Sequence, residues 1–178
     1  MNTKIKSFLI KALNNDSGKK LLRTVFGTIQ NLGMSVESGF NSRDWSNSEL
    51  ARFGYLFQGD IVNVSGWLDS DRSALGAKKN YIEYFPNHAN YVITNYPGTR
   101  GLEESPSSIP LDLEQSVPSE LQNRFDVVFN HTTLEHIFDI NTAVDTLAQL
   151  SRDIVIVVVP FIQHQHYDDG SYGDYWRF

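Results

Sequence analysis

The chain has 178 residues, of which 40% are hydrophobic and 12% aromatic, and its net charge is −6. This is enough apolar material for one domain with a buried core. The absence of cysteine excludes disulfides, thiolate metal sites and cysteine nucleophiles. An acidic chain lacks the basic face that nucleic acids require. Because no apolar run reaches the ~20 residues of a membrane span, we expect a cytoplasmic protein with no integral membrane segment.

The first 30 residues differ in charge from the rest, since they carry six lysines or arginines against one aspartate. Apolar residues recur at helical spacing over 4–13 and again over 21–29, which predicts two amphipathic helices. A further short helix is expected at 47–56. We therefore assign residues 1–58 to an N-terminal helical extension that packs on the domain as a cap. A basic pair of helices lying on an anionic membrane surface is the alternative.

From residue 59 onward the pattern changes to short apolar runs that are typical of buried strands. The expected strands are 60–64, 90–94, 108–113, 125–129 and 153–160. The last run is apolar on both faces, as expected for a central parallel strand covered by helices on either side. A helix with Asp139 or Asn141 as its N-cap precedes it. This alternation predicts a doubly wound, mostly parallel, Rossmann-like α/β sheet over residues 59–178.

Ligands of such sheets bind at the carboxyl ends of the strands, so the polar residues at those ends are the candidate site. The candidates are Ser65, Gly66 and Trp67 after the first strand, Asn95 after the second, Asp112 after the third, and Asn130 with His131 after the fourth. The alternative for Asp112 is to cap the turn that follows it. No G-x-G-x-x-G motif is present, which argues against a dinucleotide site.

Two further patterns allow more than one interpretation. Thr132-Thr133-Leu134-Glu135 matches a capping box, in which Glu135 would reach back to a backbone N–H at a helix start. After the fifth strand, His164 and His166 point the same way in an extended chain. They are candidate metal ligands or, in the favoured interpretation, part of a polar loop over the pocket mouth.

The order of these pieces resembles the class I S-adenosylmethionine-dependent methyltransferases, in the branch often found among surface-glycan biosynthetic enzymes. The matching motifs are F-D-V-V at 125–128 followed by L-E-H at 134–136, and D-Y-W-R-F at 174–178. The resemblance implies S-adenosylmethionine as cofactor and methyl transfer to a small-molecule or glycan acceptor.

Specific roles follow from this resemblance for the strand-end residues. Ser65, Gly66 and Trp67 would meet the methionine part of the cofactor, Asn95 the ribose, Asp112 the adenine, and Asn130 and His131 the sulfur side. His131, His164 and His166 are candidate bases. The ring faces of Trp67, Tyr96 and Phe129 are candidates for stabilising the sulfonium.

The chain also departs from the family pattern. The first loop has one glycine, and Asn95 stands where an acidic residue is usual. A methyltransferase-like scaffold or binding protein without cofactor is therefore the alternative function. The family normally continues beyond W-R-F, so we expect a missing C-terminal segment or a partner chain to cover the fifth strand.

Overall fold

The computed structural model describes residues 42–73, 78–98, 107–160 and 173–178. The chain divides into two compact units, Met1–Trp45 and Ser46–Phe178, and the sheet lies wholly in the second. The two helices expected over 4–13 and 21–29 lie outside the described residues. Among the described residues, no helix is long and apolar enough to cross a membrane.

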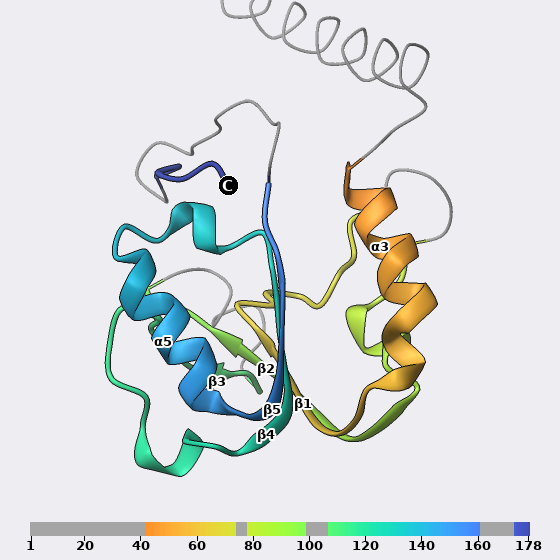
Figure 1. The fold of residues 1–178 in the computed structure, drawn as a ribbon, viewed down its shortest axis with the longest axis horizontal. Coiled ribbons are helices and arrows are strands. Elements are labelled where there is room, and N and C mark those ends of the chain that lie inside the picture. Colours follow the sequence, from red (N-terminus) through yellow and green to blue (C-terminus); the bar gives the residue numbers. More distant parts are fainter. Residues whose placement is uncertain (1–41, 74–77, 99–106, 161–172) are drawn as a thin grey trace, which may run out of the picture. The chain divides into compact units, whose positions relative to one another are not determined.

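Five parallel strands form one sheet, which confirms the predicted α/β class (Figure 1). The strands are β1 Gln58–Val64, β2 Asn87–Asn95, β3 Ile109–Pro110, β4 Phe125–His131 and β5 Ser151–Val158. Their order across the sheet is β3-β2-β1-β4-β5, and all four pairings are parallel. The chain thus builds outward from β1 in one direction and then from β4 in the other, as in a doubly wound Rossmann-like sheet.

Within the described ranges, two helices and four short 3₁₀ turns accompany the sheet. The helices are α3 Ser42–Phe53 and α5 Ile140–Leu150, and the turns are η1 Gly54–Leu56, η2 Tyr81–Tyr84, η3 Ser119–Leu121 and η4 Leu134–His136. Asp139, one of the two predicted candidates, is the N-cap of α5 and accepts a hydrogen bond from the Thr142 amide at 3.2 Å. Helix α3 confirms the short helix expected at 47–56, although it begins earlier.

The central strands β1 and β4 bury both faces, and a different set of elements covers each one. On one face Val62, Val64 and Val128 pack against residues of α5 such as Leu147. On the other face the buried set includes Leu50 of α3, Ile61, Tyr81, Tyr84, Phe85, Val127 and Phe129. The apolar side chains on both faces of these strands are therefore shielded from water, as in other parallel sheets.

The structure corrects two of the predictions. Strand β5 is not a central strand, because within the described residues it pairs with β4 alone and stands at the sheet edge. Val155 and Val157 are 39% and 40% exposed, whereas the sequence predicted cover on both faces. The capping box is also wrong: Thr133, not Thr132, is the N-cap of η4, and its side chain makes no capping hydrogen bond.

A charged clip ties together the amino ends of β1, β4 and β5. The Asp126 carboxylate accepts a hydrogen bond from the Asp60 amide at 2.7 Å and contacts the Arg152 guanidinium at 3.0 Å. Arg152 also lies 3.3 Å from Asp60. At Gly59 the backbone is left-handed (φ 89°), and an added Cβ would lie 2.2 Å from Asp126, so no other residue fits without movement.

The clip predicts a loss of stability in acid. The hydrogen bond from the Asp60 amide, aided by Arg152, holds the pKa of Asp126 below its ordinary value of 3.8. The folded state therefore gains stability from this group above about pH 4, and the gain disappears as the pH falls through the folded pKa. Urea unfolding between pH 7 and pH 2.5 should show Asp126→Asn less stable than wild type at neutral pH and equal to it in acid.

The matched control is Asp145→Asn, which changes an exposed carboxylate on α5. It should leave the difference between neutral and acidic stability unchanged. If Asp126→Asn kept the full acid sensitivity of the wild type, the clip would not be its source.

Candidate functional site

The site lies where the winding of the sheet reverses, between the carboxyl ends of β1 and β4. These strands are neighbours, with Val64 paired to Asn130. In open parallel sheets the connections leave these two strands in opposite directions, and ligands usually bind outside the strand tips at this point. The predicted residues Ser65, Asn95 and Asn130 all lie at this edge of the sheet, so the structure brings them together.

The loop after β1 is fastened to the tip of β2. Successive amides of the loop donate to it: Ser65 to the Thr94 hydroxyl at 3.3 Å, and Gly66 to the Thr94 carbonyl at 3.2 Å. The Trp67 amide donates to the Asn95 side chain at 2.7 Å. These N–H groups are the ones that would otherwise approach a ligand.

The buried Asn95 side chain holds this loop in place through hydrogen bonds. It is 3% exposed, and its amide group donates to the Trp67 carbonyl at 3.3 Å and to the Ser108 hydroxyl at 3.0 Å. The sequence suggested a contact with a ribose instead. The geometry shows contacts within the protein on both ends of the carboxamide.

The same loop stores backbone strain. Ser65, Trp67 and Asp69 have φ values of 57°, 48° and 59°, in the left-handed region that glycine normally occupies. Strained backbone of this kind persists where the surroundings enforce it, and it concentrates at ligand sites. The glycines missing from the sequence are thus replaced by residues that adopt a glycine-like path. Gly66 itself is required by the neighbouring Asn63, whose side chain lies 2.5 Å from the position of an added Cβ.

Asn130 at the tip of β4 has a buried acceptor without a partner. Its side chain is 0% exposed, and its Nδ2 donates to the Val64 carbonyl at 3.0 Å. Its Oδ1 accepts no hydrogen bond from any residue that the structure describes. Such an atom costs about 1–3 kcal/mol unless a water or a ligand supplies a donor. Asn47 on α3 has a similar unpaired Oδ1, but Asn130 is the one on the sheet.

His131, the next residue, is held by two hydroxyl groups. Its Nε2 lies 3.1 Å from the Ser46 Oγ of α3, and its Nδ1 lies 3.2 Å from the Thr132 Oγ1. Its ring lies against Tyr81, with the centroids 5.3 Å apart. Hydroxyls donate or accept, so these contacts orient the ring without fixing which nitrogen carries the proton. Sequence reasoning missed Ser46, which lies 85 residues away in the chain.

Asp112 caps a turn, which was the alternative prediction for it. Its Oδ1 accepts from the Glu114 amide at 2.9 Å, and its carbonyl accepts from the Gln115 amide at 3.3 Å. The Leu111 amide donates to the Asn95 carbonyl at 3.0 Å, so this turn begins beside the tip of β2. The carboxylate is therefore close to the candidate site while its main contact is local.

Two buried aspartates beyond the first loop are fully occupied by structure. Asp69 accepts from the Asn63 side chain, the Tyr91 hydroxyl and the Ile82 amide at 2.8, 2.6 and 3.0 Å. Burial, together with the Asp69 charge, raises the pKa of Tyr91. Asp71 accepts from the Tyr84 hydroxyl at 2.9 Å. Neither carboxylate is offered to a ligand.

The Asp71 carboxylate stays ionised because it is well bonded. Burial acts to raise its pKa, but hydrogen bonds from the Ser73 amide and the Tyr84 hydroxyl outweigh burial and leave the pKa below the ordinary value. In return, burial and the contact with Asp71 raise the pKa of Tyr84. This pair anchors the 3₁₀ turn η2 under the first loop.

The aromatic side chains proposed for a sulfonium lie in three different settings. Phe129 is 0% exposed and packs in the core beside Phe85. The face of Trp67 is covered by the Arg72 guanidinium, 4.4 Å from the ring centroid. Tyr96 is 47% exposed at the tip of β2. Of the three, Tyr96 is the most exposed.

The turn after β4 is bound by the C-terminal residues. The Glu135 carbonyl accepts from the Tyr175 amide at 2.7 Å, and the His136 Nδ1 lies 2.6 Å from the Gly173 carbonyl oxygen. Glu135 is 1% exposed, so its side chain is buried instead of reaching back as a helix cap. The L-E-H and D-Y-W-R-F motifs, far apart in sequence, therefore meet in the fold.

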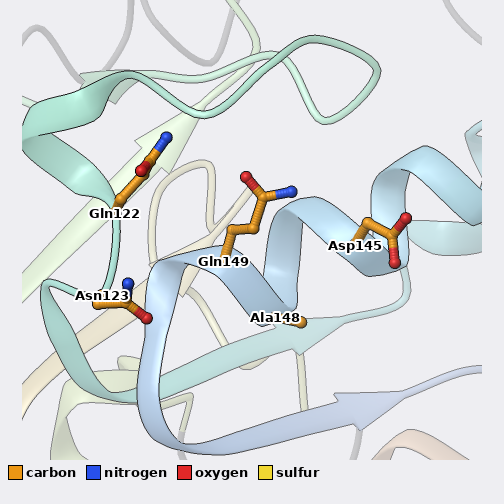
Figure 2. Close-up of a pocket in the computed structure, with 5 residues that line it drawn as sticks. All are labelled: Gln122, Asn123, Asp145, Ala148 and Gln149. Carbon is orange, nitrogen blue, oxygen red and sulfur yellow. The ribbon is translucent and has the colours of Figure 1, made fainter.

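A shallow hollow of about 320 Å³ lies at the opposite end of the sheet (Figure 2). Its lining residues are Gln122, Asn123, Asp145, Ala148 and Gln149. They precede β4 or belong to α5, and the Asn123 amide donates to the Gln149 carbonyl at 2.7 Å. This hollow is separate from the strand tips, and its lining includes none of the predicted site residues that the structure describes.

The histidine pair His164 and His166 lies outside the described residues. Within the described part of the chain, no group of three or more histidines and carboxylates is placed to hold a metal ion. Comparison with protein-family models finds no match, and comparison with curated proteins finds none either. The proposal for function therefore rests on the geometry of the strand tips and on the sequence motifs.

Proposed function

We propose that this chain is an S-adenosylmethionine-dependent methyltransferase that acts on a small-molecule or glycan acceptor. The observation that carries the proposal is the unpaired, buried Oδ1 of Asn130 at the switch point between β1 and β4. A buried acceptor at this place suits a charged amino group, such as the ammonium of the methionine part of the cofactor. The resemblance of the sequence motifs supports the same cofactor.

The strand tips fit this cofactor in part. Asn130 would bind its ammonium, and the turn at Asp112, which adjoins β2, would lie toward the adenine. The strained path of Ser65 and Trp67 supplies the narrow turn that a glycine-rich loop usually makes. Bound there, the cofactor would supply an electrophilic methyl group.

The protein's own part in the reaction is alignment and proton removal. His131 lies at the tip of β4, and it would accept the proton of an attacking hydroxyl at one of its ring nitrogens. Ser46 and Thr132 hold its ring in place for that role. Holding nucleophile and methyl group in line supplies most of the remaining rate gain.

Calorimetry tests the proposal directly. Titration of the full chain with S-adenosylmethionine, and separately with S-adenosylhomocysteine, should give saturable heats with one site per chain. Adenosine triphosphate at the same concentration serves as a control for nonspecific nucleotide binding. An absence of heat with both cofactor forms would overturn the proposal.

A scaffold or binding protein without cofactor is the second candidate, and a specific observation favours it. The amides of Ser65, Gly66 and Trp67 all donate to the tip of β2, so the first loop is closed by contacts within the protein. If that closure is permanent, the fold persists while the crevice stays shut. The same calorimetry separates the two candidates.

A further inference from the structure

An aromatic shelf stands exposed beside the turn that follows β4. The shelf consists of Phe138, Tyr175 and Trp176, which are 69%, 51% and 38% exposed. The rings of Phe138 and Tyr175 meet nearly at right angles, with their centroids 5.4 Å apart. Figure 1 shows the C-terminal segment, in dark blue, next to the turn η4. Large apolar side chains gathered at a surface mark a binding site.

The shelf is held in place without any ligand. The Trp176 indole N–H donates to the Ile137 carbonyl at 2.7 Å. The amides of Tyr175 and Trp176 both donate to the Glu135 carbonyl, at 2.7 and 3.3 Å. Aromatic groups that are already ordered lose little entropy when a ligand packs on them.

The charges around the shelf point to a neutral ligand. Its neighbouring cation, Arg177, is paired with Asp174 by two hydrogen bonds, and the charge of Glu135 also acts on it. Asp139 is engaged at the start of α5. Among the described residues, the shelf therefore presents aromatic side chains, and its neighbouring cation is paired with a protein carboxylate.

We propose that this shelf binds a neutral saccharide. An aromatic face carries negative charge density and attracts the C–H face of a pyranose ring, while the hydroxyls of the sugar stay in water. A protein partner would instead need about 800 Å² of surface per side, more than three side chains on a short turn provide. The inference goes beyond methyl transfer, because saccharide binding here needs no cofactor. If both proposals hold, the saccharide is the methyl acceptor.

Saturation-transfer NMR on the full chain tests this inference, with maltohexaose, cellohexaose and chitohexaose as separate probes. At least one should bind with a Kd near 1 mM or tighter. Phe138→Ala should weaken that binding about tenfold, a change of 1.4 kcal/mol. Phe138→Tyr, which keeps the ring, should bind as wild type does. Phe53→Ala removes another exposed phenylalanine, 42% exposed at the end of α3, and should have no effect.

Three results would overturn the inference. They are no transfer to any of the three oligosaccharides, binding that Phe138→Ala leaves unchanged, and a dimer in sedimentation that Phe138→Ala dissociates. The last would make the shelf an interface between copies of the chain. Cofactor calorimetry is run separately on the same variants, so a failure of saccharide binding is distinguishable from a failure of the methyltransferase proposal.

Discussion

Asn130→Leu should weaken S-adenosylmethionine binding about ten- to hundredfold while leaving the fold intact. A hydrogen bond to a charged group contributes about 1.5–3 kcal/mol, which corresponds to that range of Kd. The stability should change by about 1 kcal/mol or less, because leucine removes the unpaired Oδ1 at the same time as it removes the bond to Val64. Calorimetry gives the affinity, and urea unfolding gives the stability.

Asn90→Leu is the matched control. Asn90 is an exposed asparagine of β2 that donates to Asp60, away from the strand tips. This variant should bind the cofactor as the wild type does. Equal affinity of Asn130→Leu and wild type would show that the Oδ1 of Asn130 does not meet the ligand.

Asn95→Asp should lower the free energy of unfolding by about 1–3 kcal/mol. The carboxylate would lose the donors that now reach the Trp67 carbonyl and the Ser108 hydroxyl, and it would bring a charge into a site that is 3% exposed. Urea unfolding measures this cost. Asn90→Asp, at an exposed position, should cost little by comparison.

The same variant separates two roles of Asn95. The resemblance to class I methyltransferases implies an acidic residue here for the ribose, so a ribose contact would make Asn95→Asp bind the cofactor more tightly. A role in holding the loop in place predicts no gain in affinity, since the side chain is turned toward Trp67. Tighter binding in calorimetry would contradict this second role.

The sheet was predictable because each strand contains a short apolar stretch that is followed by polar or turn-forming residues. The predicted runs match the observed strands to within three residues at each end, and the N-cap of α5 is Asp139, one of the two predicted candidates. The run at 108–113 was overestimated, since β3 pairs over Ile109–Pro110 alone. A run of apolar residues indicates a strand that is buried on both faces, and such strands are typical of parallel sheets.

The details of the site were not predictable, because they depend on contacts between distant segments. The pattern Thr-x-x-Glu suggested a helix cap at Glu135, yet its side chain is 1% exposed and its carbonyl accepts hydrogen bonds from the C-terminal motif about 40 residues later. Likewise, the local sequence does not indicate that Thr94 and Asn95 accept hydrogen bonds from the backbone amides of the first loop. Contacts between distant segments therefore override the local sequence preference at both places.

The most direct test of a cofactor site at the strand tips is the amide spectrum of the labelled chain during titration with S-adenosylhomocysteine. A cofactor bound between β1 and β4 should make the Nδ2 protons of Asn130 and the backbone amides of Ser65 and Thr132 shift together and saturate at one equivalent. Shifts confined to the hollow around Gln122 and Gln149, or no shifts at all, would contradict a cofactor crevice between these strands.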